Sequence, residues 1–240
     1  MTKNAGGWNT NSSSIKYSQN NRTRGILTIS PHNPTGMIIN KNNFPAFSQG
    51  LPIICDEVFS EFCWNQSYCP ALGSFISDIP IFHLNGISKM FALPDLKLGW
   101  IALNDVAAMQ YGDRLEILND TFLGANSFSQ YILELLFLKG QDFIAEMRAR
   151  IFSNLMYASN LIDSIHGFHA IRPEGGYYLV VQYDLPIDEE EMVVGLIHEG
   201  VVTYPGYFFG DFKFNSFVIS CLSDQETITK LGQALISVSS

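Results

Sequence analysis

The stretch PIICDEV, from Pro52 to Val58, joins a short apolar run directly to a pair of acidic residues. Three similar apolar runs are GILTI (25–29), IFHLNGI (81–87) and LGWIAL (98–103). Continuous runs of this length are typical of strands that are covered on both faces of an α/β sheet. We therefore predict an α/β fold in which a mostly parallel sheet carries helices on both faces.

The apolar pattern becomes helical after the fourth run. Between Asp105 and Ile165 the apolar residues have helical spacing, and Gly124 and Gly140 separate successive helices. The last of these helices, at about 141–165, suits a connection between domains. We predict one domain at residues 1–140, of which 1–24 form a weakly structured lead-in, and a second domain at residues 141–240.

The second domain mixes strands and helices. Strand patterns return as FHAIR (168–172), GYYLVVQY (176–183), GVVTYP (200–205) and SFVISCL (216–222), and helices are predicted at about 187–198 and 224–238. Ser223 and Glu226 have the spacing of a capping box at the start of the last helix. This order of elements predicts a small α+β domain.

Composition narrows the class of protein. With 47% hydrophobic and 15% charged residues, the 240-residue chain has enough apolar surface for one sizeable core. The net charge is −9 and the basic residues are scattered, which argues against binding to nucleic acid or to an anionic membrane. No apolar run approaches the roughly 18 residues of a membrane span, and the first residues lack the apolar region of a signal peptide. We predict a globular, cytoplasmic protein.

The cysteines and histidines show no metal-binding pattern. The four cysteines contain no C-x-x-C pair, and Cys55 lies inside an apolar run, where a buried thiol is the usual interpretation. His166 and His169 are the one closely spaced histidine pair, without a carboxylate beside them. We predict neither disulfides nor a metal.

Three short segments carry the candidate chemistry: Asn33-Pro-Thr-Gly36, Asp56-Glu-Val-Phe59, and Ser88-Lys89 followed by Lys97-Leu-Gly-Trp100. Each alone also fits a structural role, as a turn, a helix cap or a surface lysine. In order, however, they fall at or near the ends of predicted strands. Ligands of open α/β sheets bind where strands end at their carboxyl side.

Together the segments resemble the cofactor site of class I and II aminotransferases, which are pyridoxal-phosphate (PLP) enzymes of fold type I. Pro173-Glu-Gly-Gly-Tyr177 and Pro205-Gly-Tyr-Phe-Phe209 resemble landmarks of that family's small domain. The resemblance covers essentially the whole chain and implies that residues 1–140 are the C-terminal part of a PLP-binding large domain. Nothing before Gly25 resembles the N-terminal part of that domain. Both edges of the remaining sheet are therefore expected to be unpaired.

The resemblance implies two central roles. Asp56 would lie against the pyridine nitrogen and keep it protonated by charge pairing, which lets PLP act as an electron sink. Lys89 would form the Schiff base with PLP and, once displaced by the substrate amine, would move the proton between substrate and cofactor.

Three further residues complete the implied cofactor site. Asn33 matches the asparagine that hydrogen-bonds the ring 3-oxygen, and a cis Asn33-Pro34 bond is plausible there. Lys97 falls where many members have a phosphate-binding arginine, and its ammonium would bind phosphate as a point charge. Ser88 either adds a hydroxyl to the site or has a structural role.

The sequence also departs from the family pattern. Phe59 occupies the position where the family usually has a tyrosine, so the hydroxyl group of that tyrosine is absent. Val218 occupies the position where many members have an arginine for the substrate carboxylate. Arg172 is a candidate to replace that arginine, although the interpretation of Arg172 as an ordinary surface residue is favoured. Tyr204 and Tyr207 would approach the substrate by analogy with the family.

The resemblance implies a PLP-dependent aminotransferase that acts on an amino acid and a 2-oxo acid through Lys89. It also implies a homodimer, or an association through the exposed sheet edges. Two alternatives stay open. Val218 leaves room for a carbon-sulfur lyase or a decarboxylase of the same fold. Phe59 and the absent N-terminal segment leave room for a non-catalytic remnant or binding module.

Overall fold

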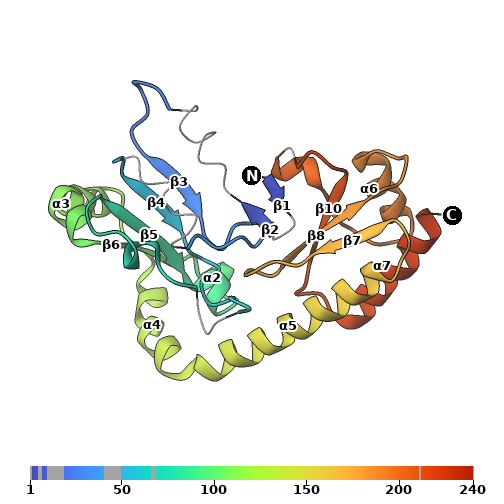
Figure 1. The fold of residues 1–240 in the computed structure, drawn as a ribbon. Coiled ribbons are helices and arrows are strands. Elements are labelled where there is room, and N and C mark those ends of the chain that lie inside the picture. Colours follow the sequence, from blue (N-terminus) through green and yellow to red (C-terminus); the bar gives the residue numbers. More distant parts are fainter. Residues whose placement is uncertain are drawn as a thin grey trace.

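The computed structural model describes residues 2–4, 7–9, 19–40, 50–65, 69–210 and 212–239. Two four-stranded sheets stand apart, and one long helix passes beneath both of them (Figure 1). The N-terminal sheet has the order β3-β4-β5-β6, and the C-terminal sheet has the order β7-β8-β10-β9. A hairpin of β1 (Thr2–Asn4) and β2 (Gly7–Asn9) lies within the predicted lead-in, where no strand was expected.

The N-terminal sheet forms from the four predicted apolar runs. Its strands are β3 (Ile26–Ile29), β4 (Ile53–Asp56), β5 (Ile81–Gly86) and β6 (Gly99–Leu103). Strands β3, β4 and β5 are parallel, and β6 is antiparallel to β5. The prediction of a mostly parallel sheet is therefore confirmed. The connection predicted around residues 38–49 lies partly outside the described residues, which omit 41–49.

One face of this sheet is well covered. Ile53, Cys55 and Ile81 form its buried side. They pack against the segment that contains the short 3-10 helix η2 (Leu72–Ser74), together with Ile76 and Ile79. The apolar residues of alternate strand positions thus reach one compact cluster, as a pleated strand requires.

The opposite face of the N-terminal sheet is more open than predicted. Leu27, Ile54 and Ile101 are 71%, 41% and 51% exposed, although each belongs to an apolar strand. Helix α3 (Asp105–Thr121) reaches this face through Tyr111, whose ring packs 5.3 Å from that of Phe82. The expectation that both faces are fully covered is therefore wrong for this face, because α3 lies over part of it only.

The helices between the sheets break where glycines were expected to break them. Helix α4 (Ser127–Lys139) ends at Gly140, and α5 (Gln141–Asp163) begins there. A Cβ at Gly140 would lie 2.5 Å from both the Leu136 carbonyl oxygen and the Phe91 ring. Glycine is therefore required for α4, α5 and Phe91 to meet at this point.

The C-terminal sheet is antiparallel along its whole width. It consists of β7 (Phe168–Ile171), β8 (Tyr178–Tyr183), β9 (Tyr204–Pro205) and β10 (Ser216–Ser220), with the 3-10 helix η4 (Gly206–Phe209) after β9. Its inner face packs with α5, α6 (Glu189–His198) and α7 (Gln225–Val238) around the largest apolar cluster of the described chain. The fold class, an α/β region followed by a small α+β region, is confirmed.

One predicted helix start is wrong in detail. Helix α7 is capped by Asp224, whose carboxylate accepts a hydrogen bond of 2.8 Å from the Thr227 amide, and not by Ser223. The capping box occurs instead at α6, between Asp188 and Glu191. Asp224 caps the helix in place of Ser223, because its carboxylate is one residue nearer to the first free amides of the helix.

Candidate functional site

The predicted site residues gather at one edge of the N-terminal sheet. Strands β3, β4 and β5 are parallel, so their carboxyl ends lie side by side, with Asp56 opposite both Ile29 and Leu84. Strand β6 runs the other way and therefore begins at this edge, where Gly99 lies opposite Gly86. We call this edge, where β3 to β5 end and β6 begins, the carboxyl edge.

Four segments emerge from the carboxyl edge. They carry Asn33 after β3, Asp56 at the end of β4, Ser88 and Lys89 after β5, and Lys97 before β6. Their origins lie far apart in the sequence, and only the strand order brings them together. This arrangement matches the position of ligand sites in open α/β sheets.

Asn33 lies in a tight loop with two cis peptide bonds, Ser30-Pro31 and Asn33-Pro34. The second agrees with the sequence-based expectation, and the first had not been anticipated. Among the described residues the Asn33 side-chain oxygen is buried and has no hydrogen-bond partner. Because a buried polar atom without a partner costs free energy, this oxygen is suited to accept a hydrogen bond from a donor on a bound molecule.

The imidazole of His32 supports the same loop. Its Nδ1 lies 3.0 Å from the buried Thr35 hydroxyl. Burial lowers the pKa of His32 to about 4, so this ring is neutral near pH 7. The loop therefore contributes neutral polar groups and no cation.

The same loop is also hydrogen-bonded to the C-terminal region. The Gly36 carbonyl accepts a hydrogen bond of 2.9 Å from the Gly175 amide. The Glu174 carboxylate accepts another of 3.1 Å from the Ile38 amide. Gly36 has a φ of +67°, and a Cβ there would collide with Pro173. We call this junction, between residues 30–39 and the turn at 173–176, the loop interlock.

Asp56 ends β4 half-buried. Its side-chain oxygen Oδ1 accepts a hydrogen bond of 3.1 Å from the Val58 amide, which turns the chain away from the sheet. Its carbonyl oxygen accepts a bond of 2.9 Å from the Ser30 amide. The carboxylate is therefore fixed at the carboxyl edge and keeps further acceptor capacity.

Lys89 lies on the short helix α2 (Ile87–Met90), which follows β5 without a linker. Ile87 and Met90 are buried against Phe91 and Leu98, so Ser88 and Lys89 lie on the less buried side of the turn. A Cβ at Gly86 would lie 2.7 Å from the Leu98 carbonyl oxygen, which explains a glycine at this close approach.

Lys97 lies between the 3-10 helix η3 (Pro94–Leu96) and β6, and it is exposed. Its φ is 49°, and Ala92 nearby has a φ of 53°. Non-glycine residues seldom adopt this left-handed conformation, and such residues cluster at functional sites. The backbone geometry thus marks the segment between Lys89 and Lys97.

Phe59 is buried next to two tyrosines of the C-terminal region. Its ring lies 4.9 Å from the ring of Tyr177 and 6.0 Å from that of Tyr178, both edge to face. Burial raises the pKa of both phenols, which keeps them neutral. No sequence pattern predicts this contact, because it joins segments more than a hundred residues apart.

The substrate-binding candidates have different surroundings. Val218 is fully buried between Val180 and Tyr204 on the neighbouring strands. Tyr204 and Tyr207 are 53% and 52% exposed. Arg172 pairs with Asp163 of α5 at 3.3 Å on the surface. This pairing agrees with the interpretation of Arg172 as a surface residue.

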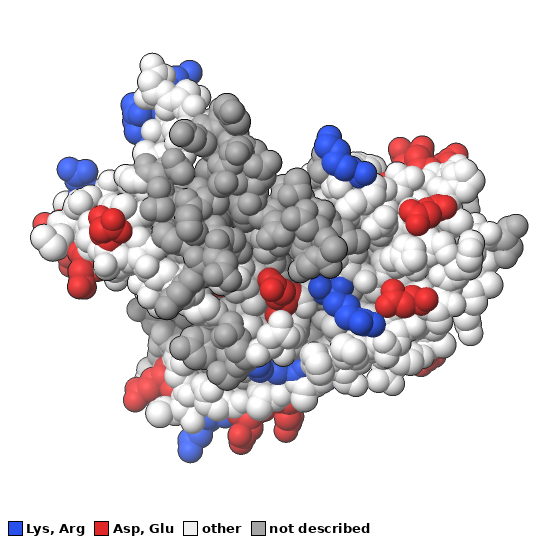
Figure 2. Space-filling view, viewed as in Figure 1, with Lys and Arg blue, Asp and Glu red and all other residues white. Residues whose placement is uncertain are grey.

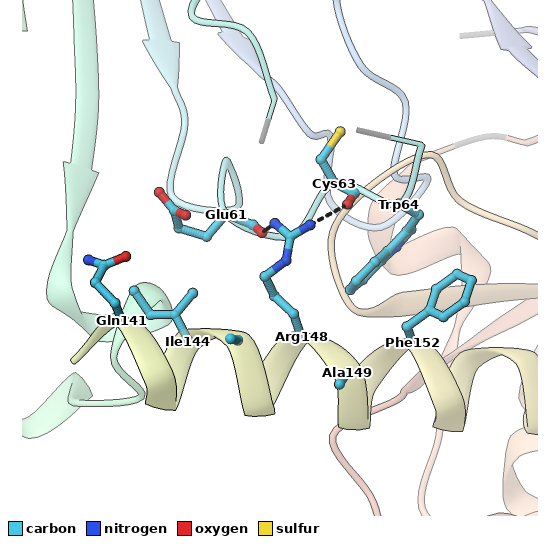
Figure 3. A pocket seen from close by; sticks show the side chains of 9 residues that line it. Glu61, Cys63, Trp64, Gln141, Ile144, Arg148, Ala149 and Phe152 are labelled. Carbon is cyan, nitrogen blue, oxygen red and sulfur yellow. Dashed lines mark hydrogen bonds between the residues drawn. The ribbon is translucent and has the colours of Figure 1, made fainter. Parts of the chain in front are cut away.

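A separate pocket of about 500 Å³ lies between α5 and the loop after β4 (Figure 3). Arg148 points from α5 into this pocket and donates hydrogen bonds to the carbonyl oxygens of Glu61 and, at 3.1 Å, Cys63. The guanidinium therefore joins α5 to that loop. None of the predicted site residues lines this pocket.

Other kinds of site find little support in the described part of the chain. No group of three or more His, Cys, Asp or Glu side chains there could hold a metal ion. None of the described helices is long and apolar enough to cross a membrane. On the face shown in Figure 2, Lys and Arg lie singly among Asp and Glu.

The comparison with protein families identifies the chain's relatives. The family model described as aminotransferase class I and II matches residues 7–235. This chain belongs to that family. The family assignment from the three short segments is thereby confirmed.

Curated aminotransferase relatives are similar over about half their length. The glutamate-pyruvate aminotransferase AlaA of Escherichia coli strain K12 is 28% identical over 203 residues, which are 78% of this chain and 50% of the relative. The tyrosine aminotransferase of Dictyostelium discoideum is 27% identical over 211 residues, which are 80% of this chain and 51% of the relative.

Solved structures of the family share the fold. An aminotransferase from Escherichia coli has a TM-score of 0.82 and 26% identity, covering 95% of this chain and 60% of that one. Cystalysin from Treponema denticola, whose structure contains a pyridoxal 5'-phosphate cofactor, has a TM-score of 0.83 at 17% identity, covering 98% and 62%. The second likeness shows the fold alone.

Proposed function

We propose that this chain binds pyridoxal 5'-phosphate at the carboxyl edge, and that the whole protein is an aminotransferase acting on an amino acid and a 2-oxo acid. The observation that carries the proposal is the convergence of Asn33, Asp56, Lys89 and Lys97 on one sheet edge, in a chain of the aminotransferase family. The buried side-chain oxygen of Asn33, which has no partner in the described part of the chain, is open to a hydrogen-bond donor of a bound molecule.

The residues at the edge suit the parts of the cofactor. Lys89 would bond to its aldehyde carbon, and Asp56 would pair with the protonated pyridine nitrogen. Asn33 would hydrogen-bond the ring oxygen, while Lys97, with Ser88, would bind the phosphate. When bound, PLP supplies an electron sink for bonds at the substrate's α-carbon.

The protein's own part in the reaction is to position groups and to move one proton. The Lys89 amine, placed by the buried residues Ile87 and Met90, would take up a proton at Nζ and release it again. Phe59, Tyr177 and Tyr178 would form an apolar wall that limits water near the site.

Substrate binding would differ from the pattern with an arginine at residue 218. The buried Val218 offers no charge, but Tyr204 lies beside it on β9 and exposes its side chain. We therefore propose that Tyr204, with Tyr207, contacts the substrate carboxylate through its hydroxyl group. Arg172 has no place in this proposal, because Asp163 and Asn160 already hold its guanidinium.

The assembly is part of the same proposal. The chain spans about half the length of the curated relatives it matches, so activity is expected of the whole protein. Strands β3 and β6 bound the N-terminal sheet and could join it to further polypeptide, in one chain or in a homodimer. We also propose a domain division at residue 140, between α4 and α5, and a cytoplasmic location.

The decisive experiment is to add PLP to the purified chain, reduce with borohydride, and identify the labelled peptide. The proposal predicts visible absorbance from a bound imine and a label on Lys89. Lys89→Ala should lose the label. The matched control is Lys139→Ala, which should keep it, since Lys139 lies in α4 outside the site. A label on another lysine, or equal labelling of the Lys89→Ala variant, would refute the assignment.

The buried Val218 keeps one alternative reaction in view, a carbon-sulfur lyase of the same fold. Product analysis of the whole protein distinguishes the two. A transaminase makes a new amino acid from an added 2-oxo acid, whereas β-elimination gives pyruvate and ammonia. Finding only the elimination products would replace the aminotransferase proposal.

A further inference from the structure

Glu57, directly after Asp56, is buried on the opposite side of the N-terminal sheet. Cys55 and His83 are partners across β4 and β5 and lie on the same face as Glu57, because side chains alternate along a strand. The Glu57 side chain is only 10% exposed, and that of His83 only 13%. A carboxylate so deeply buried needs hydrogen-bond donors around it.

Two donors from two different elements meet the Glu57 carboxylate, and the Cys55 thiol lies on the same face of the sheet. His83 Nδ1 lies 2.9 Å from its Oε1. The Leu72 amide, at the start of η2, donates to the same oxygen at 3.1 Å. Burial and the nearby Glu57 carboxylate raise the pKa of the Cys55 thiol, so this thiol keeps its proton beside Glu57. We call these four residues the Glu57 hub.

The hub is tightly enclosed. A Cβ at Gly73 would lie 2.7 Å from His83 Nε2, so η2 packs directly on the imidazole. The backbone of Glu57 is fixed as well, because its amide donates to the Leu84 carbonyl oxygen at 2.8 Å and its carbonyl oxygen accepts from the Ser60 amide at 2.9 Å. Glu57 is therefore held by both side chain and backbone at the point where β4 leaves the sheet.

The consequence reaches Asp56 through the backbone. Asp56 and Glu57 are adjacent, and their side chains leave the strand on opposite faces of the sheet. Contacts that fix Glu57 on one face therefore also fix the direction of the Asp56 side chain on the other. The Val58 amide, one residue beyond Glu57, donates to Asp56 Oδ1. Moving Glu57 would move both the carboxylate and its donor.

We infer that Glu57, held by His83 and Leu72, is a positioning residue that sets the orientation of the Asp56 carboxylate at the carboxyl edge. This inference rests on the proposed function, in which Asp56 pairs with the pyridine nitrogen of PLP. Glu57 itself touches neither cofactor nor substrate. Its role is to give Asp56 the fixed geometry that a charge pair with a ring nitrogen needs.

The first test needs no cofactor. Hydrogen exchange of the Val58 amide is compared with that of Ile53, at the start of the same strand, in the wild-type chain, Glu57→Ala, Glu57→Gln and Glu61→Ala. Glu61 is the matched control, since it lies in the same loop outside the hub. We expect exchange at Val58 to rise about tenfold in Glu57→Ala with Ile53 unchanged, and Glu57→Gln to recover part of the protection.

The second test uses the chain loaded with PLP. The pH dependence of the bound cofactor's absorbance reports protonation of its imine nitrogen, and the pKa of that imine depends on the charge that Asp56 holds at the ring nitrogen. In Glu57→Ala this pH profile should shift toward that of Asp56→Asn, while Glu61→Ala should keep the wild-type profile. A purely structural role would lower the melting temperature and leave the profile unmoved.

The outcomes separate the inference from the proposed function. If the wild-type chain takes up no PLP, the cofactor proposal fails, and the Val58 exchange still decides whether Glu57 orders Asp56. Equal acceleration of Val58 and Ile53 in Glu57→Ala would overturn the inference, because it would mean general loosening of the strand. An unshifted pH profile in loaded Glu57→Ala would overturn it as well.

Discussion

The two sheets of this protein are covered to different degrees. The C-terminal sheet packs its inner face under α5, α6 and α7, where Leu179, Val181 and Phe217 are fully buried. The N-terminal sheet buries one face and leaves Leu27 and Ile54 exposed on the other. The proposed cofactor site therefore lies on the less completely covered of the two regions.

The physical reason is the number of helices available to each sheet. Three helices cover the C-terminal sheet, whereas α3 reaches only part of the open face of the N-terminal one. Burial of apolar area stabilises by about 25 cal/mol per Å². The C-terminal region should therefore be the more stable of the two.

The largest expected effect comes from a matched pair of leucines. Leu179→Ala, in the C-terminal core, should lower the free energy of unfolding by roughly 2 to 5 kcal/mol. Leu27→Ala, at 71% exposure, should change it by less than about 0.5 kcal/mol. Urea unfolding followed by tryptophan fluorescence measures both. Equal losses would contradict the contrast between the sheets.

Binding of PLP should stabilise the region around the N-terminal sheet. At about 100 times its Kd, PLP should add about 2.7 kcal/mol to the stability of whatever folds around it. Hydrogen exchange should slow in β4 and β5 and stay nearly constant in β8 and β10. Protection that appears only in the C-terminal strands would place the cofactor elsewhere.

The link between the regions can be weakened at Arg148. Arg148→Met leaves the carbonyl oxygens of Glu61 and Cys63 without this donor, which should cost roughly 1 to 3 kcal/mol. Arg150→Met, two residues along α5 and mostly solvent-exposed, serves as the control. The thermal transition of the Arg148 variant should broaden or split as the two regions uncouple. An unchanged single transition would mean that other contacts dominate the link.

The open face should also govern self-association of the isolated chain. Leu27→Lys with Ile54→Lys places charge on exposed apolar positions and should reduce light scattering at high protein concentration. Val202→Lys is the control, because Val202 is 78% exposed in the C-terminal region. If the control lowers scattering as strongly, the open face has no special part in association.

The smallest effect concerns the cap of α7. The hydrogen bond from the Thr227 amide lowers the pKa of Asp224 below its ordinary value of 3.8. A folded-state pKa below the unfolded one stabilises the protein above pH 3.8, and this contribution is lost as pH falls through the folded-state pKa. Asp224→Ala should therefore lower the melting temperature slightly near pH 7, and the difference from wild type should vanish in acid. Ser223→Ala should show no such difference.

Much of the fold could be predicted because its signals are local. The runs at Ile26–Ile29, Ile53–Asp56 and Ile81–Gly86 are mainly apolar, and Gly140 marks the break before α5. These features depend on residues that are neighbours in sequence. The location of Lys89 just beyond β5 followed from the same pattern.

The rest depends on contacts between distant segments. The open face reflects how little of the sheet α3 covers, which no strand pattern reveals. The Glu57 hub joins residues 55 and 57 to 72 and 83, and neither a buried carboxylate nor its donors have a periodic signature. The prediction of Ser223 as the cap of α7 was wrong for a related reason. Ser223 and Asp224 could each cap this helix, and only the backbone geometry determines which of them does.

The loop interlock has a consequence for protein engineering. Residues 30–39 are hydrogen-bonded to the turn at 173–176, through Gly36, Ile38, Glu174 and Gly175. A chimaera that exchanged only residues 141–240 with a relative would therefore set a foreign turn against the native loop. The natural unit of exchange in this protein is discontinuous: a swapped C-terminal region should bring its own version of residues 30–39, although strands β4, β5 and β6 separate the two along the chain.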